Sequence, residues 1–143
     1  MSLEFDLEIP DGLAVHRDVG GVDLIVAVGE LGDPAATTIS VDAARGGAAG
    51  DGLTRDEHVA RVRANLEHDL DPHLVDQAEM PLAGQEAWWT IDAFARDGRS
   101  LVLDTWMLVR DGVGWTVSLQ MPWSDVHQLR DGAIAIVSTL RFT

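Results

Sequence analysis

Two identical Arg-Asp-Gly segments constrain the fold of this chain more than any other feature. They separate three strand-like runs between residues 85 and 122, with turns at Asp97-Gly98 and Asp111-Gly112. A two-residue Asp-Gly turn is typical of a type I′ β-hairpin, in which both turn residues need positive φ. The segments therefore predict two tight hairpins and an antiparallel meander of three strands.

A two-residue turn also fixes which side chains share a face of the meander. It pairs Trp89 with Trp106, Trp106 with Val117, and Asp104 with Leu119. One face is then almost wholly apolar, and it consists of Ala87, Trp89, Ile91, Ala93, Val102, Trp106, Leu108, Trp115, Val117, Leu119 and Met121, with Asp104 as its one clear misfit. A three-residue loop at either turn would shift the register by one residue and exchange the faces.

The opposite face is apolar in part, so the sheet needs cover on both sides. Two amphipathic helices are expected to supply it. One begins at the capping box Thr54-Arg55-Asp56-Glu57 and runs to Asp71-Pro72, with Val59, Val62, Leu66 and Leu70 towards the sheet. The other begins at Trp123-Ser124 with Ser124 as its N-cap, and its apolar stripe consists of Leu129, Ala133, Ile136, Val137 and Leu140. An α+β fold follows, an α/β/α sandwich around an antiparallel sheet of about six to seven strands.

The rest of the chain supplies the other strands. Alternation, β-branched residues and turn signals predict strands at residues 3–9, 13–17, 22–31, 36–43 and 73–80. The Gly-rich residues 46–52 are expected to form a loop. No repeat or low-complexity tract divides the 143 residues, so residues 1–143 are expected to form a single domain.

Composition excludes several functions. The chain has no cysteine, lysine or tyrosine, which excludes disulfides, thiolate metal sites, cysteine nucleophiles and Schiff-base chemistry. Its ten basic residues, all arginine, face 24 acidic ones, and the net charge of −14 repels nucleic acids and anionic membranes. No apolar run approaches the ~20 residues of a membrane span.

The same composition bears on origin and location. A lysine-free chain rich in Ala, Gly and Asp is typical of a GC-rich genome, for example an actinobacterial one, and a salt-adapted source would also explain it. The N-terminal segment has no basic or apolar leader region, so a cytoplasmic location is expected unless a natural leader was trimmed away.

The order of elements resembles a known superfamily. The opening Phe5 to Pro10-Asp11-Gly12-Leu13, the single helix before a long meander, and the closing helix ending Ser138-Thr139-Leu140-Arg141-Phe142 together look like the PsbP-like superfamily. That group includes PsbP itself, the Ran-binding factor of the Mog type and the actinobacterial LpqN-like proteins. The resemblance implies the α/β/α sandwich and a binding or accessory role, and it assigns no functional residue.

Reactive motifs are missing from the sequence. The Gly47 to Gly52 segment has P-loop glycine spacing, but Leu53-Thr54 follows where a P-loop has lysine before the hydroxyl residue. The five histidines show no metal-ligand spacing, and the dense group Glu67-His68-Asp69 is expected to be solvated. No catalytic residue, metal or cofactor is therefore predicted.

Asp104 and the tryptophans are the candidate site residues. A carboxylate on the face of Trp89, Trp106 and Trp115 is typical of a ligand-binding or acid/base site. The alternatives are an arginine or hydroxyl partner, a position near an open edge of the core, or an error in the register. Core packing is likewise the alternative for the tryptophans.

Two hypotheses of function follow. The first is a non-enzymatic accessory domain that binds a protein partner or a second copy of itself, with Trp123 and Trp88 as candidate contact residues. The second is a small-ligand-binding protein or enzyme with a pocket beside Asp104.

Overall fold

The computed structural model describes residues 5–19, 22–28, 36–44 and 53–143. In chain order the elements are β1 (Phe5–Asp6), β2 (Ala14–Val19), β3 (Val22–Val28), β4 (Thr37–Ala43), α1 (Arg55–Leu70), β5 (His73–Glu79), β6 (Ala87–Arg96), β7 (Arg99–Arg110), β8 (Val113–Pro122), the 3₁₀ turn η1 (Trp123–Asp125), α2 (Val126–Val137) and β9 (Arg141–Phe142). Among these, no helix is long and apolar enough to cross a membrane.

Seven strands form one antiparallel sheet in the order β2-β3-β4-β8-β7-β6-β5. Two meanders compose it, β2-β3-β4 and β5-β6-β7-β8, and the pairing of β4 with β8 joins them. The chain reaches the far edge of the sheet through α1, which follows β4 and precedes β5. This architecture confirms the predicted α+β fold.

The predicted register of the long meander is confirmed. Trp89 pairs with Trp106, Trp106 with Val117, and Asp104 with Leu119. The turn residues Asp97 and Gly98 have φ of 53° and 75°, and Asp111 and Gly112 have φ of 52° and 77°. Both turns therefore have the positive φ pair of a type I′ hairpin.

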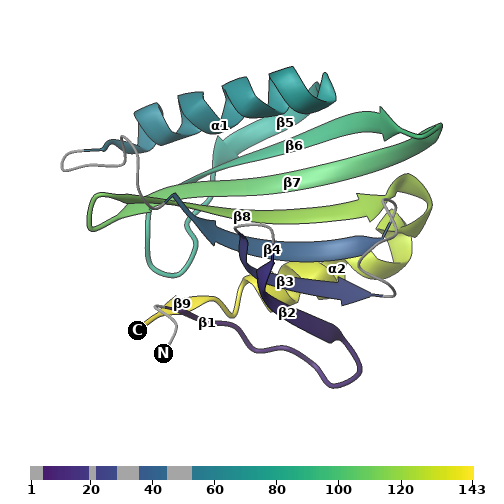
Figure 1. Ribbon diagram of the computed structural model, residues 1–143, viewed down its shortest axis with the longest axis horizontal. Coiled ribbons are helices and arrows are strands. Elements are labelled where there is room, and N and C mark those ends of the chain that lie inside the picture. The colour runs from purple at the N-terminus through teal and green to yellow at the C-terminus, as the bar shows by residue number, and fades with distance from the viewer. Residues whose placement is uncertain (1–4, 20–21, 29–35, 45–52) are drawn as a thin grey trace.

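The two helices lie on opposite faces of the sheet (Figure 1). The α2 face carries the main apolar core, in which Trp106, Leu108, Val117 and Leu119 of the sheet pack with Ala133, Val137 and Leu140 from the C-terminal region. On the α1 face a smaller cluster of Phe94, Leu101 and Leu103 packs against Leu66 and Leu70. The expectation of a helix on each side is confirmed.

Each helix also contributes an arginine to a buried carboxylate of the sheet. On the α1 face Arg63 makes a bidentate pair with Asp92, with Nη1–Oδ2 and Nη2–Oδ1 distances of 2.6 and 2.9 Å. On the α2 face Arg130 pairs with Asp104. Asp92 and Asp104 are 0% and 1% exposed, so both ions depend on their arginines for charge compensation.

The start of α1 follows the sequence signal. Thr54 is the N-cap, and its hydroxyl oxygen accepts from the Glu57 backbone N–H at 3.2 Å. The Glu57 carboxylate accepts from the Thr54 hydroxyl at 3.0 Å, instead of from a backbone donor as in the expected capping box. The helix ends at Leu70, and Asp71 adopts the left-handed conformation before Pro72.

Three expected boundaries are wrong. The strand expected at residues 3–9 is paired only at Phe5–Asp6, because the chain then leaves the β1–β9 ribbon. Ser124 is not the cap of the second helix, since η1 comes first and α2 begins after Asp125, which makes no side-chain cap hydrogen bond. The closing helix ends at Val137, and Arg141–Phe142 returns as strand β9 beside β1. The loop expected at 46–52 and residues 29–31 lie outside the described residues.

Candidate functional site

The carboxylate of Asp104 lies inside the core with polar partners of its own. The Trp89 indole Nε1–H donates to Asp104 Oδ2 at 2.9 Å, and Arg130 Nη2 donates to the same oxygen at 2.7 Å. Arg130 Nε lies 3.4 Å from Oδ1. An arginine therefore neutralises this carboxylate, which was one of the alternatives to a ligand-binding role.

The predicted site residues are brought together only in part. Trp89, Trp106 and Asp104 lie on one face of β6 and β7, and all three are at most 9% exposed. Trp115 is on the same face, but its ring contacts Phe5 and Phe142, with ring centroids 5.5 and 5.1 Å away. The ligand-binding role of this group stays a prediction, and the pocket described below is lined by other residues.

The two candidate partner-binding tryptophans differ in exposure. Trp123 is 63% exposed, the largest exposed fraction among the large apolar side chains described. Trp88 is half-buried, with the Arg55 guanidinium 5.9 Å from its ring centroid. Partner binding by either residue stays a prediction.

The described histidines form no metal-binding cluster with other ligand-type side chains. His68 is exposed and contacts Asp69 at 3.0 Å, as expected for a solvated group. His58, in contrast, is the buried residue of α1 itself at 4% exposed, and its Nε2 lies 3.0 Å from the Trp115 carbonyl oxygen. Burial lowers the pKa of His58 below its ordinary value of 6.5, and the charge of Arg61 lowers it further.

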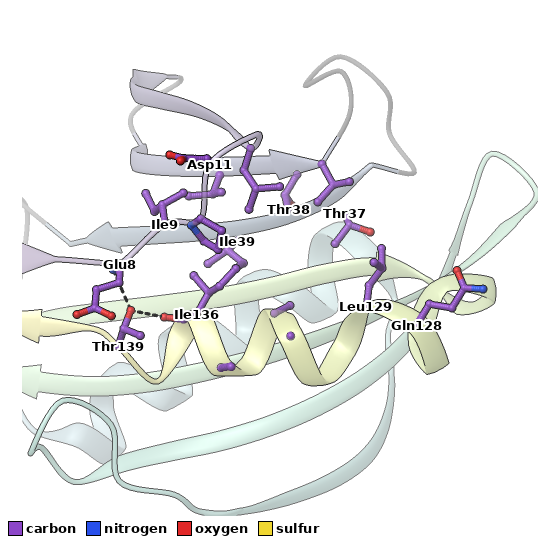
Figure 2. Close-up of a pocket in the computed structure, with 17 residues that line it drawn as sticks. Glu8, Ile9, Asp11, Thr37, Thr38, Ile39, Gln128, Leu129, Ile136 and Thr139 are labelled. Atoms are coloured by element: carbon purple, nitrogen blue, oxygen red, sulfur yellow. Dashed lines mark hydrogen bonds between the residues drawn. The ribbon is translucent and has the colours of Figure 1, made fainter.

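A pocket of about 660 Å³ lies on the α2 face, between α2, strands β3 and β4, and the segment that connects β1 to β2 (Figure 2). This volume is within the ordinary range for small-molecule sites. The strands follow one another in the order β3, β4, β8, and α2 packs over β8. Part of β3 and β4 is therefore left uncovered beside the helix, and this uncovered part is the pocket. Residues 8–11 and Leu13 form the rest of its described lining from the segment between β1 and β2.

The pocket wall is predominantly aliphatic. Its central side chains are Val26 and Val28 of β3, Ile39 of β4, and Leu129, Ala133 and Ile136 of α2. Val28 is 44% exposed, so an apolar surface of the pocket is open to solvent. A large exposed apolar concavity of this kind is the usual mark of a ligand-binding or interaction site.

Polar side chains mark the two ends of the pocket. Figure 2 shows Thr37 and Gln128 at one end, and Glu8 and Thr139 at the other. The Thr139 hydroxyl is satisfied, since it accepts from the Glu8 backbone N–H at 2.9 Å and donates to the Ile136 carbonyl at 2.6 Å. The described lining contains the carboxylates of Glu8 and Asp11 and no arginine or histidine.

Thr37 differs from the other polar lining residues because it is buried without a partner. It is 6% exposed, and its Oγ1 makes no hydrogen bond in the described structure. A buried hydroxyl without a partner costs about 1–3 kcal/mol. Such a group in a pocket wall indicates a place where a polar atom of a ligand would be accepted.

Gly132 lines the pocket on the side of α2. It lies inside α2, where glycine costs up to about 1 kcal/mol relative to alanine. A Cβ atom at this position would meet no other heavy atom within 4 Å, so packing does not require glycine. The pocket was not predicted from the sequence. A glycine inside an apolar helix stripe, Gly132, and a hydroxyl residue on the apolar face of a strand, Thr37, were the signals that could have indicated it.

Comparisons with known proteins identify the fold. No family model matches the sequence, and no curated protein sequence matches it. Among solved structures, LpqN, involved in cell envelope biogenesis of Mycobacterium tuberculosis, superposes with a TM-score of 0.68 at 16% identity, covering 97% of this chain and 83% of LpqN. CyanoP, the cyanobacterial PsbP of Synechocystis, gives 0.65 at 14% identity over 98% of this chain and 87% of its own.

A third similar structure is that of PA94 from Pseudomonas aeruginosa, described as a putative regulator of unknown function. It gives a TM-score of 0.63 at 21% identity over 93% of this chain and 88% of its own. The chain therefore has the PsbP-like fold that LpqN shares. At these identities the likeness concerns the fold and leaves the site to its own chemistry.

Proposed function

We propose that this chain is a non-enzymatic binding protein whose α2 pocket holds the apolar chain of an amphiphilic small molecule. The observation that carries the proposal is the open, aliphatic pocket of about 660 Å³ on an otherwise acidic protein. The sheet and α2 form two of its walls, so most of the site is built on regular secondary structure, and the segment between β1 and β2 completes the described lining. The similarity to LpqN and CyanoP is compatible with an accessory role.

The chemistry of the lining supports binding and not catalysis. A hydroxyl nucleophile needs a base within hydrogen-bond reach. The Thr139 hydroxyl donates to a backbone carbonyl, and the Thr37 hydroxyl has no hydrogen-bond partner in the described structure. The described lining includes no histidine, and its carboxylates, on Glu8 and Asp11, are not hydrogen-bonded to the hydroxyl of Thr37 or Thr139.

A protein partner is the second candidate, and the exposure of Trp123 favours it. Large aromatic side chains are frequent anchors of protein interfaces. Trp123 is the first residue of η1, directly after Pro122, and it does not belong to the described lining of the pocket. The two functions are therefore separable by substitution.

The pocket is tested by filling it from Gly132. Diphenylhexatriene, a hydrocarbon that fluoresces in apolar surroundings, serves as the probe. Gly132→Leu places a side chain at a pocket-lining position and improves helix propensity, so we expect probe affinity to fall at least tenfold while the melting temperature stays the same or rises. Gly132→Ala, with the same helix benefit and little added volume, is the matched control and keeps the affinity.

Further readouts define the outcome. Linear alcohols that displace the probe are expected to bind about fourfold more tightly per added methylene, from about 0.8 kcal/mol per buried CH₂. Trp123→Ala is expected to leave probe binding unchanged. Absence of probe binding by the wild-type protein, or equal binding by Gly132→Leu, contradicts the proposal.

A further inference from the structure

Thr37 gives the pocket a second property besides its apolar wall. The residue begins β4, and register places its side chain on the same face as Ile39, towards α2. Thr37 lines the pocket, and its hydroxyl is buried in the wall and makes no hydrogen bond in the described structure. A side chain of the same shape without the hydroxyl, valine, would fit a purely apolar pocket at lower cost.

The charges around the pocket limit what can lie beside Thr37. The described lining residues carry two carboxylates, on Glu8 and Asp11, and no cationic side chain. The whole chain carries a net charge of −14. An anionic head group would lose hydration here without gaining a counter-charge, whereas an uncharged hydroxyl or amide gains the Thr37 hydrogen bond.

The two ends of the pocket also differ in what they can offer. At the end that Glu8 and Thr139 form, the far end, the Thr139 hydroxyl is already hydrogen-bonded to the Glu8 backbone N–H and the Ile136 carbonyl. At the near end Thr37 lies by Leu129 and Gln128 (Figure 2), where α2 begins. The Thr37 end therefore offers a buried uncharged hydroxyl without a hydrogen-bond partner in the described structure, whereas the other end offers the anionic carboxylate of Glu8.

We propose that Thr37 is the specificity-determining residue of the pocket, and that it hydrogen-bonds the uncharged polar head of a single-chain amphiphile whose tail lies along α2 towards Ile136. This inference rests on the proposed function, since it assigns the head group of the molecule that the pocket holds. It assigns a ligand class as well, an alcohol or amide with an unbranched apolar chain, and it excludes the corresponding carboxylates.

The test compares ligands that differ only in the head group. Decanol, decanoate and diphenylhexatriene are titrated into the wild-type protein and into Thr37→Val. We expect Thr37→Val to weaken decanol about fivefold, the value of one ordinary hydrogen bond, and to leave the hydrocarbon probe unchanged. The wild-type protein is expected to bind decanol at least tenfold more tightly than decanoate at pH 8.

Protein stability supplies a readout that a merely structural role would not reproduce. Removing an unpartnered buried hydroxyl is expected to leave the melting temperature of Thr37→Val equal to or above that of the wild type. Weaker decanol binding by a protein of undiminished stability supports the inference. Equal weakening of decanol and the hydrocarbon, unchanged decanol affinity, or decanoate binding as tight as decanol would each overturn it while leaving the apolar pocket intact. Failure of the wild-type protein to bind either decanol or the hydrocarbon overturns the proposed function itself.

Discussion

The ion pair between Arg130 and Asp104 attaches α2 to the sheet, and its removal has a calculable cost. Asp104 is 1% exposed, whereas the Arg130 side chain is 26% exposed. Replacing Arg130 with Met leaves a buried carboxylate whose remaining side-chain partner in the described structure is the Trp89 indole. Breaking a buried pair in this way costs about 3–5 kcal/mol, a large part of the 5–15 kcal/mol that stabilises an ordinary domain.

The converse substitution is much milder. In Asp104→Asn the side-chain oxygen still accepts from Trp89 and Arg130, and Arg130 retains access to water. We expect a loss of about 1 kcal/mol, the value of weakening charge-assisted hydrogen bonds to neutral ones. The double variant Arg130→Met/Asp104→Asn buries no unpaired charge, so it is expected to lose only about 1–2 kcal/mol and to be more stable than Arg130→Met alone.

Urea unfolding at pH 7, followed by tryptophan fluorescence, measures the free energies of unfolding of the wild type and the three variants and hence the coupling energy of the pair. Arg63→Met on the opposite face is the matched control, and Asp104→Asn is not expected to rescue it, because Arg63 pairs with Asp92. The reasoning is refuted if Arg130→Met loses less than about 1 kcal/mol, or if Asp104→Asn fails to rescue it. Unchanged probe binding by Asp104→Asn would also separate this residue from the α2 pocket.

Two further predictions concern the contact between α1 and β8. A Cβ atom at Gly114 would lie 2.4 Å from His58 Nδ1. Gly114→Ala is therefore expected to destabilise the protein by about 1–3 kcal/mol, measured by thermal unfolding. A second substitution in the same chain, His58→Ala, is expected to recover part of that loss. Burial holds the pKa of His58 below 6.5, so the unfolded chain takes up the proton first as pH falls, and the free energy of unfolding is expected to decrease from pH 6.5 down to the folded-state pKa. His58→Gln should lack this component in urea unfolding between pH 5 and 8, and an identical pH dependence in both proteins would contradict the assignment.

The sequence predicted the features that depend on local chemistry. Asp-Gly turns need positive φ at both positions, and that requirement alone placed Trp89 opposite Trp106. The Thr54 cap likewise placed the start of α1 correctly. Alternation at residues 3–9 was misleading, because Leu7 is buried in the core without belonging to a paired strand.

Features that depend on distant segments were missed. The burial of His58 depends on the absence of a side chain at Gly114, 56 residues further along the chain by their numbering. The partner of Asp104 comes from a helix whose docking no local pattern specifies. The pocket similarly results from the position of α2 across β8. The apolar stripe of α2 predicted that the helix is buried, but it could not predict that part of β3 and β4 beside the helix stays uncovered.

The division of the sheet into two meanders has a consequence for its dynamics. The β4–β8 pairing is the sole described connection between strands of the two groups, so an opening that separates the two groups would have to break it. The pocket spans that boundary, with β3 and β4 on one side and α2 on the other. A molecule bound there would contact both sides of that boundary and hold them together. Its dissociation would allow the N-terminal meander to open independently of the rest.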